Sequence, residues 1–220
     1  MTAGLGRARV SPGGGLITIT GSTGRIGGLV ARDLAARGIP LRLVVRDATR
    51  APDLAQAEIR TADYADGEAV RRALEDAGTV LMVSSTEAPN RLDAHRTFVD
   101  AAAAAGISHL VYTSFVAAAP RATLTLARDH WATEEHIRST GLPFTFLRDN
   151  LYADFLPRML GEDSVLRGPA ADGRVSVVAQ VDVAAAAVAV LRSPQTYLGH
   201  YQGWSVTDPA WWGLARNTNW

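Results

Sequence analysis

Residues 16–28, "LITITGSTGRIGG", decide the fold of this 220-residue chain. The apolar and β-branched run at its start predicts a short buried strand, and the glycines after it predict a tight turn into a helix over 24–38. The spacing Gly21-x-x-Gly24-x-x-Gly27 is typical of a turn whose helix N-terminus binds a pyrophosphate. A strand–helix turn without a ligand is the alternative, and the strand before the motif and the helix after it favour a dinucleotide site.

The same alternation of strand and helix continues to residue 150. Apolar runs predict further strands, within 41–45, 57–64, 79–85, 109–114 and 143–150, with helices at 67–78, 91–106 and 125–141. This pattern predicts an α/β fold, a doubly wound parallel sheet of the Rossmann type with strand order 3-2-1-4-5-6.

We therefore expect three parts: a flexible N-terminal arm over 1–15, an NAD(P)-binding Rossmann domain over 16–150, and a small C-terminal substrate lobe over 151–220. In that lobe the sequence predicts a strand at 174–178 and a helix at 182–193 with Asp182 as its N-cap. The last 17 residues contain four of the five tryptophans and follow no period.

The composition excludes several kinds of chemistry. All 22 basic residues are arginine, and cysteine is absent. Disulfides, thiolate catalysis, Schiff bases and lysine-dependent proton relays are therefore excluded, and the segment 125–141 lacks the Tyr-x-x-x-Lys pair that many reductases of this build carry. Twenty-two acidic residues balance the arginines, which argues against a nucleic-acid or membrane partner. The absence of a long apolar run predicts a cytoplasmic protein, and the histidine spacing predicts no metal.

The predicted cofactor-binding residues lie in the glycine turn and at the carboxyl ends of the strands, where parallel sheets bind ligands. They are Gly21, Ser22, Thr23, Gly24, Arg25, Ile26, Gly27, Arg46, Asp63, Tyr64, Ser84, Ser85 and Thr86. Asp63 and Tyr64 are placed to border an adenine, and the loop 84–87 to follow the nicotinamide ribose. Asp63 and Tyr64, and likewise the residues of the loop 84–87, are equally suited to be ordinary turn formers.

Arg46 predicts which dinucleotide is bound. A guanidinium after the second strand can form a fork with a 2′-phosphate, with Arg50 near enough to help. A contact of about 2 kcal/mol favours NADPH over NADH roughly 30-fold. The alternatives are a solvated Arg46 and a ribose-binding Asp47, which suits NAD.

Seven stretches of the chain resemble NmrA-like atypical short-chain dehydrogenases, in particular NADPH-dependent type 2 quinone oxidoreductases. The stretches are "TGSTGRIG", "VVRD", "ADYAD", "VSSTE", "HLVYTSF", "LARDHWATEEHIRSTGLPFTFLRDNLY" and "GPAADGRVSVVAQVDVA", within roughly 15–193. The resemblance implies a nicotinamide-binding Rossmann domain with a small C-terminal substrate lobe. It also implies that the missing Tyr-x-x-x-Lys pair is normal for this branch. Where such proteins continue with a strand of the "TYDLTGPE" kind, this chain has "YLGHYQGWSVTDPAWW", which predicts a shortened lobe. At Asp149 the relatives vary between proline and asparagine.

The missing pair is compatible with reduction of a quinone or a similar conjugated small molecule. Hydride transfer to a quinone gives a delocalised anion that water can protonate, so the main requirement is to hold both reactants together. The candidate catalytic residues are His130, Asn150 and Tyr152, and each has structural roles as an alternative. His136 and Glu134 are expected to face solvent or pair with arginines, and His95 and His109 to lie too far from the cleft. A dinucleotide-binding redox sensor without turnover is the competing function, and an inactive fragment is a third possibility.

Overall fold

The computed structural model describes residues 16–163, 165, 176–197 and 201–203. The predicted N-terminal arm over 1–15, the first two residues of the predicted strand at 174–178, and the tryptophan-rich tail over 204–220 lie outside these residues.

The centre of the molecule is a parallel sheet of seven strands in the order β3-β2-β1-β4-β5-β6-β9. The strands are β1 (Leu16–Thr20), β2 (Leu41–Val45), β3 (Ala57–Thr61), β4 (Ala77–Met82), β5 (His109–Phe115), β6 (Phe144–Asp149) and β9 (Tyr201–Gly203). The predicted order 3-2-1-4-5-6 is confirmed. Strand β9 pairs with β6 in parallel and was not predicted, because a strand of three residues carries too little pattern.

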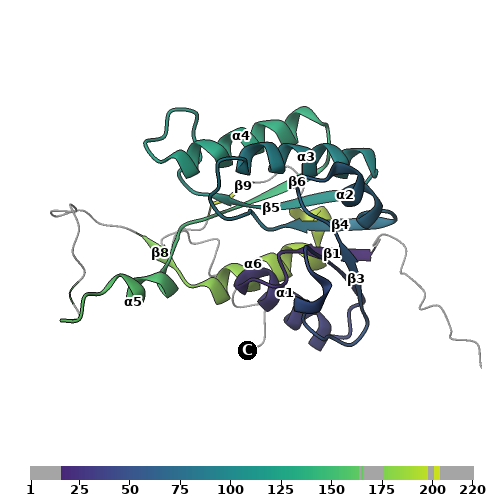
Figure 1. Cartoon of the computed structure of the whole chain (residues 1–220), viewed down its shortest axis with the longest axis horizontal. Coiled ribbons are helices and arrows are strands. Elements are labelled where there is room, and N and C mark those ends of the chain that lie inside the picture. Colours follow the sequence, from purple (N-terminus) through teal and green to yellow (C-terminus); the bar gives the residue numbers. More distant parts are fainter. Residues whose placement is uncertain (1–15, 164, 166–175, 198–200, 204–220) are drawn as a thin grey trace, which may run out of the picture.

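Helices cover both faces of the sheet (Figure 1). On one face, α1 (Arg25–Ala36) packs against α6 (Gln180–Arg192). On the other face lie α2 (Gly67–Ala73), α3 (Arg91–Ala104) and α4 (Thr125–Ser139). The central strands are therefore buried on both sides, which explains their continuous apolar runs.

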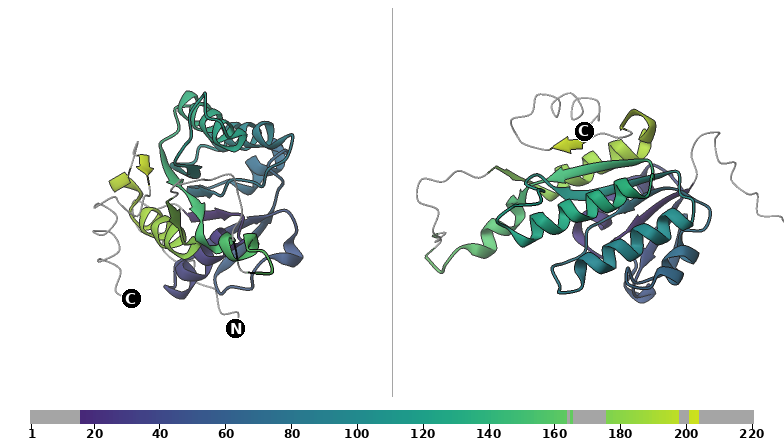
Figure 2. Two further views of the ribbon diagram at one scale, coloured as in Figure 1. Left: turned by 90° about the vertical axis from the view of Figure 1, so that its left-hand side faces the viewer. Right: turned by 90° about the horizontal axis from the view of Figure 1, so that it is seen from above.

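The segment after β6 extends beyond the sheet (Figure 2). It comprises β7 (Leu151–Tyr152), the 3₁₀ turn η2 (Ala153–Phe155) and the short helix α5 (Leu156–Met159). Strand β7 pairs in parallel with β8 (Val177–Val178) to form a second, two-stranded sheet. Two further 3₁₀ turns are η1 (Ala48–Arg50) and η3 (Pro194–Tyr197).

Helix α6 differs from its prediction at the N-terminus. It begins at Gln180 with Ala179 as the N-cap, so the prediction that Asp182 caps it was wrong. Asp182 lies in the first turn, and the carboxylate of Asp154 accepts the backbone N–H of Gln180 at 2.9 Å. A side chain from a distant segment thus does the capping. The division at residue 150 between a Rossmann domain and a C-terminal lobe stays a prediction. Helix α6, which lies beyond residue 150, shares one hydrophobic core with α1.

Candidate functional site

The glycine turn has little room for any other residue. Gly21 adopts a φ of +64°, which L side chains rarely adopt, and its carbonyl accepts the N–H of Gly24 at 2.9 Å. A Cβ added at Gly27 would lie 2.5 Å from the Gly21 carbonyl oxygen. Helix α1 therefore starts in direct contact with the end of β1, and its free N–H groups face the carboxyl edge of the sheet.

Two cavities meet at this turn. We name them after one residue that lines each: the Arg46 cavity, of about 340 Å³, and the Asp149 cavity, of about 370 Å³. Of the predicted residues, both cavities share Gly21, Gly24, Ser84, Ser85 and Thr86. The Arg46 cavity adds Thr23, Arg46, Asp63 and Tyr64, and the Asp149 cavity adds Arg25, Ile26, Gly27, His130, Asn150 and Tyr152.

Ser22 is the one predicted site residue that lines neither cavity. It is 2% exposed, and its hydroxyl has no hydrogen-bond partner in the structure. Its side chain therefore points into the protein.

The Arg46 guanidinium lines the Arg46 cavity, whereas the carboxylate of the next residue, Asp47, does not. Arg46 is exposed and lines the cavity, whereas Asp47 and Arg50 are not among its lining residues. The Asp47 carboxylate caps η1 by accepting the N–H of Thr49 at 2.9 Å and the Thr49 hydroxyl at 2.7 Å, and these bonds lower the pKa of Asp47. This arrangement suits a 2′-phosphate better than a ribose hydroxyl bound by Asp47.

Asp63 and Tyr64 have structural bonds in addition to their place at the cavity. Asp63 accepts the N–H of Ala65 at 2.9 Å, as a turn former does. The Tyr64 hydroxyl bonds the Thr20 hydroxyl and donates to the Val83 carbonyl at 2.8 Å, and burial raises its pKa. Tyr64 therefore ties the ends of β1 and β4 together beneath the point where the cavities meet.

Side chains from helix α3 and strand β5 hold the loop at Ser84 and Ser85. The Ser84 N–H donates to the Thr113 hydroxyl at 2.8 Å, and the Ser85 N–H donates to His95 Nε2 at 3.1 Å. Arg91 Nε donates to the Ser85 carbonyl at 2.9 Å. His95 lines neither cavity, but it contacts this loop, so it lies closer to the site than we expected. His109 instead bonds Thr145 at 2.9 Å, away from the cavities.

Both buried histidines of this network are neutral. Because His95 Nε2 accepts from Ser85, its proton sits on Nδ1, which lies 3.1 Å from the Thr133 hydroxyl. Burial, together with the nearby charge of Arg91, lowers the pKa of His95 to about 3. Burial and Arg91 likewise hold the pKa of His130 well below its usual value.

His130 has partners at both ring nitrogens. Arg91 donates to its Nε2 at 3.1 Å, and its Nδ1 lies 2.9 Å from the Tyr112 hydroxyl. The role of His130 as a proton donor stays a prediction, and these bonds favour positioning of Arg91 over proton transfer. Arg91 is 2% exposed, and its Nη1 also lies 3.5 Å from the Asp129 carboxylate.

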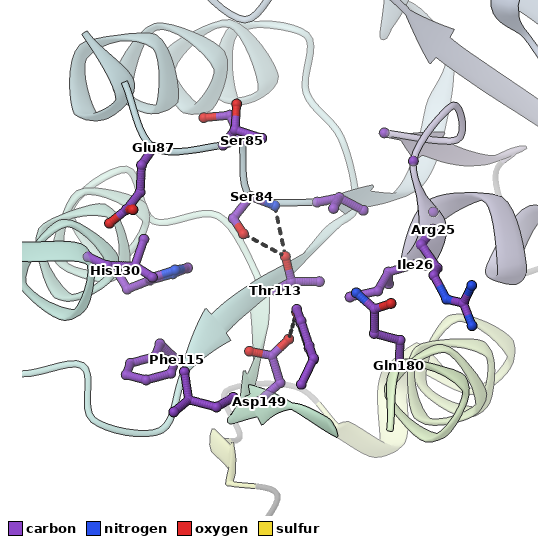
Figure 3. A pocket seen from close by; sticks show the side chains of 18 of the residues that line it. Arg25, Ile26, Ser84, Ser85, Glu87, Thr113, Phe115, His130, Asp149 and Gln180 are labelled. Carbon is purple, nitrogen blue, oxygen red and sulfur yellow. Dashed lines mark hydrogen bonds between the residues drawn. The ribbon is translucent and has the colours of Figure 1, made fainter. Parts of the chain in front are cut away.

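The Asp149 cavity has Arg91 and His130, from α3 and α4, on one wall. Asp149 lies on the opposite wall, at the carboxyl end of β6 (Figure 3). It is 5% exposed, and its Oδ2 accepts the Tyr152 hydroxyl at 2.5 Å. Burial raises the pKa of Asp149 to about 7, although the bond from Tyr152 acts in the opposite direction. The neighbouring Asn150 side chain accepts the N–H of Leu151 at 2.8 Å.

Glu134 and His136 on α4 were expected to face solvent or to pair with arginines, and only Glu134 pairs with arginines. Glu134 does not face solvent: it is fully buried and bonds Arg148 at 2.5 Å and Arg138 at 3.3 Å. His136 pairs with a carboxylate, that of Asp100, at 2.7 Å. Neither lines the two cavities.

Several residues of the site were not predicted, chiefly Arg91, Thr113, Asp149 and Gln180. Asp149 had a usable signal, since it ends a predicted strand at the ligand-binding edge of the sheet. Arg91 reads as an ordinary first residue of a helix, and only the fold brings it to Ser85.

Within the residues that the structure describes, no group of three or more His, Cys, Asp or Glu side chains is placed to hold a metal ion. Among the described helices, none has the length and apolar character to cross a membrane.

The fold and the glycine turn define a Rossmann-type domain with its cleft at the carboxyl edge of the sheet. Residues 14–206 match the NmrA-like family, and the chain belongs to that family.

Two curated relatives and two solved structures show what the chain is similar to. Over 185 residues it is 35% identical to quinone oxidoreductase 2 of Escherichia coli (strain K12), covering 80% of this chain and 64% of that protein. It is 28% identical to the NAD(P)H azoreductase of Xenophilus azovorans, covering 88% of this chain and 68% of that protein. The chain thus spans about two thirds of the length of these relatives.

Among solved structures, the Citrobacter sp. triphenylmethane reductase complexed with NADP(H) superposes with a TM-score of 0.79 at 31% identity, covering 88% of this chain and 70% of that one. The E. coli NADPH-dependent quinone oxidoreductase complexed with NADPH gives a TM-score of 0.78 at 33% identity, covering 86% and 69%.

Proposed function

We propose that this chain binds NADPH across the two cavities and reduces a quinone or a similar conjugated acceptor in the Asp149 cavity. The observation that carries the proposal is the meeting of the two cavities at the glycine turn and at Ser84–Thr86. A dinucleotide needs such a continuous cleft, with its pyrophosphate at the N-terminus of α1.

The residues of each cavity fit one half of that cofactor. The Arg46 guanidinium suits a 2′-phosphate, and the competing carboxylate of Asp47 is bonded to the N–H of Thr49 instead of lining the cavity. The Asp149 cavity has apolar walls from Ile26, Phe115 and Leu126, which suit a flat conjugated ring. Bound NADPH would supply the hydride.

The relatives support this choice of substrate. Quinone oxidoreductase 2 and the NAD(P)H azoreductase are named for acceptors with conjugated π-systems. Such acceptors place a smaller demand on a proton donor than simple ketones do, because the negative charge after hydride transfer is delocalised. The chain has no lysine to build the usual Tyr-x-x-x-Lys relay, which is consistent with this chemistry.

The test is NADPH oxidation by the purified chain against a panel of quinones and azo dyes, with NADH in parallel. Cofactor binding is measured in the same samples by fluorescence. Turnover that prefers NADPH supports the proposal. Binding of NADPH with no oxidation of any acceptor contradicts it and favours a dinucleotide sensor, and failure to bind either dinucleotide removes both functions.

A further inference from the structure

Asp149 is a buried acid placed where the acceptor would lie. Strands β5 and β6 pair in parallel with Phe115 opposite Asp149, so both side chains leave the sheet on the same face at its ligand-binding edge. Both line the Asp149 cavity together with Thr113 and Ile26. An acceptor in this cavity would therefore contact the end of β6.

The arginines around Asp149 are engaged with other groups. Arg148, the preceding residue, points to the opposite face of the sheet and pairs with Glu134. Arg25 pairs with Asp154 at 3.0 Å, and Arg91 lies within the network of Ser85, His130 and Asp129 on the far wall.

A carboxyl buried without a cation retains its proton more readily than an exposed one. The raised pKa of Asp149, about 7, has burial as its cause and no charged neighbour. The group therefore exchanges a proton near neutral pH, where an acid catalyst is most effective.

We infer that Asp149 is the proton donor to the acceptor, held in place by the Tyr152 hydroxyl. This inference rests on the proposed function. The acceptor gains two electrons and one proton as the hydride of NADPH, and the second proton comes from the Asp149 carboxyl. The O–H bond of Asp149 breaks as a bond to the acceptor oxygen or nitrogen forms, and the resulting carboxylate regains a proton from water.

The other titratable or charged groups that line this cavity are less suited to the role. They are Arg25, Glu87, Arg91, His130 and Tyr152. The two arginines are engaged as described, and the pKa of His130 is too low for it to carry a proton at neutral pH. Glu87 is exposed, and Tyr152 has a raised pKa with its hydroxyl directed at Asp149.

The first part of the test compares the pH dependence of kcat with a quinone for the wild type and Asp149→Asn. An amide keeps the shape and can still accept from Tyr152, but it has no acidic proton. We expect kcat to fall about 100-fold, and the decline of the wild-type rate above pH about 7 to disappear. Asp33→Asn, at a half-buried position of α1 where Asp33 pairs with Arg37, is the matched control and keeps the wild-type profile.

Tyr152→Phe provides a second, independent variant. The hydroxyl of Tyr152 lowers the pKa of Asp149, so its removal moves the decline in rate to higher pH. A purely structural role of Asp149 predicts no such movement. The loss in Asp149→Asn is also expected to grow with the proton affinity of the reduced acceptor, which a series of substituted quinones measures.

Infrared difference spectroscopy gives a readout that needs no turnover. The band of a protonated carboxyl should titrate near pH 7 in the wild-type protein and be missing in Asp149→Asn. If this band is absent at pH 6, or if Asp149→Asn keeps the wild-type rate and pH profile, the inference is overturned while the proposed function stands. If the wild type fails to oxidise NADPH with every acceptor in the panel, the proposed function fails and the inference fails with it.

Discussion

The two walls of the Asp149 cavity are both polar and buried, but they differ in how their charged groups are partnered. On the wall from α3 and α4, Arg91 contacts the Ser85 carbonyl, His130 and Asp129, and its neighbours are neutral histidines. On the wall at the end of β6, Asp149 is bonded to Tyr152 and has no cation beside it. A charge with several partners fixes a loop, whereas a buried acid without a cation can exchange its proton. We therefore infer that the first wall positions the loop and that the second wall transfers the proton.

The largest effect is expected from removing the charge at the centre of the first wall. Arg91→Met should lower the free energy of unfolding by about 3–5 kcal/mol, because the Ser85 carbonyl and the Asp129 carboxylate lose a buried partner. Denaturant unfolding measures this loss. Arg96→Met on the same helix is the matched control, since Arg96 is half-exposed and its ion pair with Asp93 spans 3.8 Å. Equal losses in the two variants would contradict a special role for Arg91.

A smaller loss is expected at the glycine turn, which both cavities share. Gly27→Ala brings a methyl group to 2.5 Å from the Gly21 carbonyl oxygen, so α1 must shift. We expect unfolding to become easier by about 1–3 kcal/mol and NADPH binding to weaken. Gly67→Ala in α2 meets only the side chain of Thr97, at 3.3 Å, and should leave NADPH binding intact. Unchanged NADPH affinity in Gly27→Ala would place the pyrophosphate away from this turn.

Arg46→Ala tests the Arg46 cavity, where we expect the 2′-phosphate of NADPH to bind. Loss of a charge-assisted contact of about 2 kcal/mol should reduce the preference for NADPH over NADH roughly 30-fold. Arg50→Ala, the control, removes a nearby arginine that does not line the cavity. The ratio of the two dissociation constants is the measurement, and an unchanged ratio in Arg46→Ala would remove this residue from cofactor selection.

The two walls should also respond to acid with opposite signs. His95, His130 and the more distant His109 have folded-state pKa values below the usual 6.5, so the unfolded chain binds more protons and stability falls as pH drops below 6.5. Asp149 has a folded-state pKa of about 7 against 3.8 for an ordinary aspartate, so between these values it gains stability as pH falls.

Asp149→Asn removes only the second of these contributions. Between pH 6.5 and about 4 its free energy of unfolding should therefore fall more steeply than that of the wild type, by up to about 1.4 kcal/mol per pH unit. Denaturant unfolding at several pH values tests this, with Asp33→Asn as the control. Parallel pH slopes in wild type and Asp149→Asn would show that Asp149 is already ionised in the folded protein.

The part of the site that could be predicted from sequence is the part made by local chemistry. The turn at Gly21 needs a positive φ, and the helix at Gly27 needs a residue without a Cβ, so both requirements are visible as glycines in the chain. The strand order followed from the alternation of elements and the handedness of crossovers.

The remaining part depends on contacts between distant segments. Arg91 reaches His130, 39 positions away, and Asp154 caps the helix that begins at Gln180, 26 positions away. Nothing in the local sequence distinguishes Arg91 from the exposed Arg96, and the position of Asp149 at a strand end indicates its edge of the sheet but not its burial. Burial separates them, and burial is a property of the whole fold.

The separate roles of Arg46 and Asp149 are tested most directly by the rate of quinone reduction with NADPH as the varied substrate, for the wild type, Arg46→Ala and Asp149→Asn. We expect Arg46→Ala to raise the KM for NADPH roughly 30-fold with little change in kcat. We expect Asp149→Asn to lower kcat about 100-fold with little change in that KM. A wild type that does not oxidise NADPH, or two variants that change the same parameter, would contradict the division of the cleft into a cofactor end and a proton-donating wall.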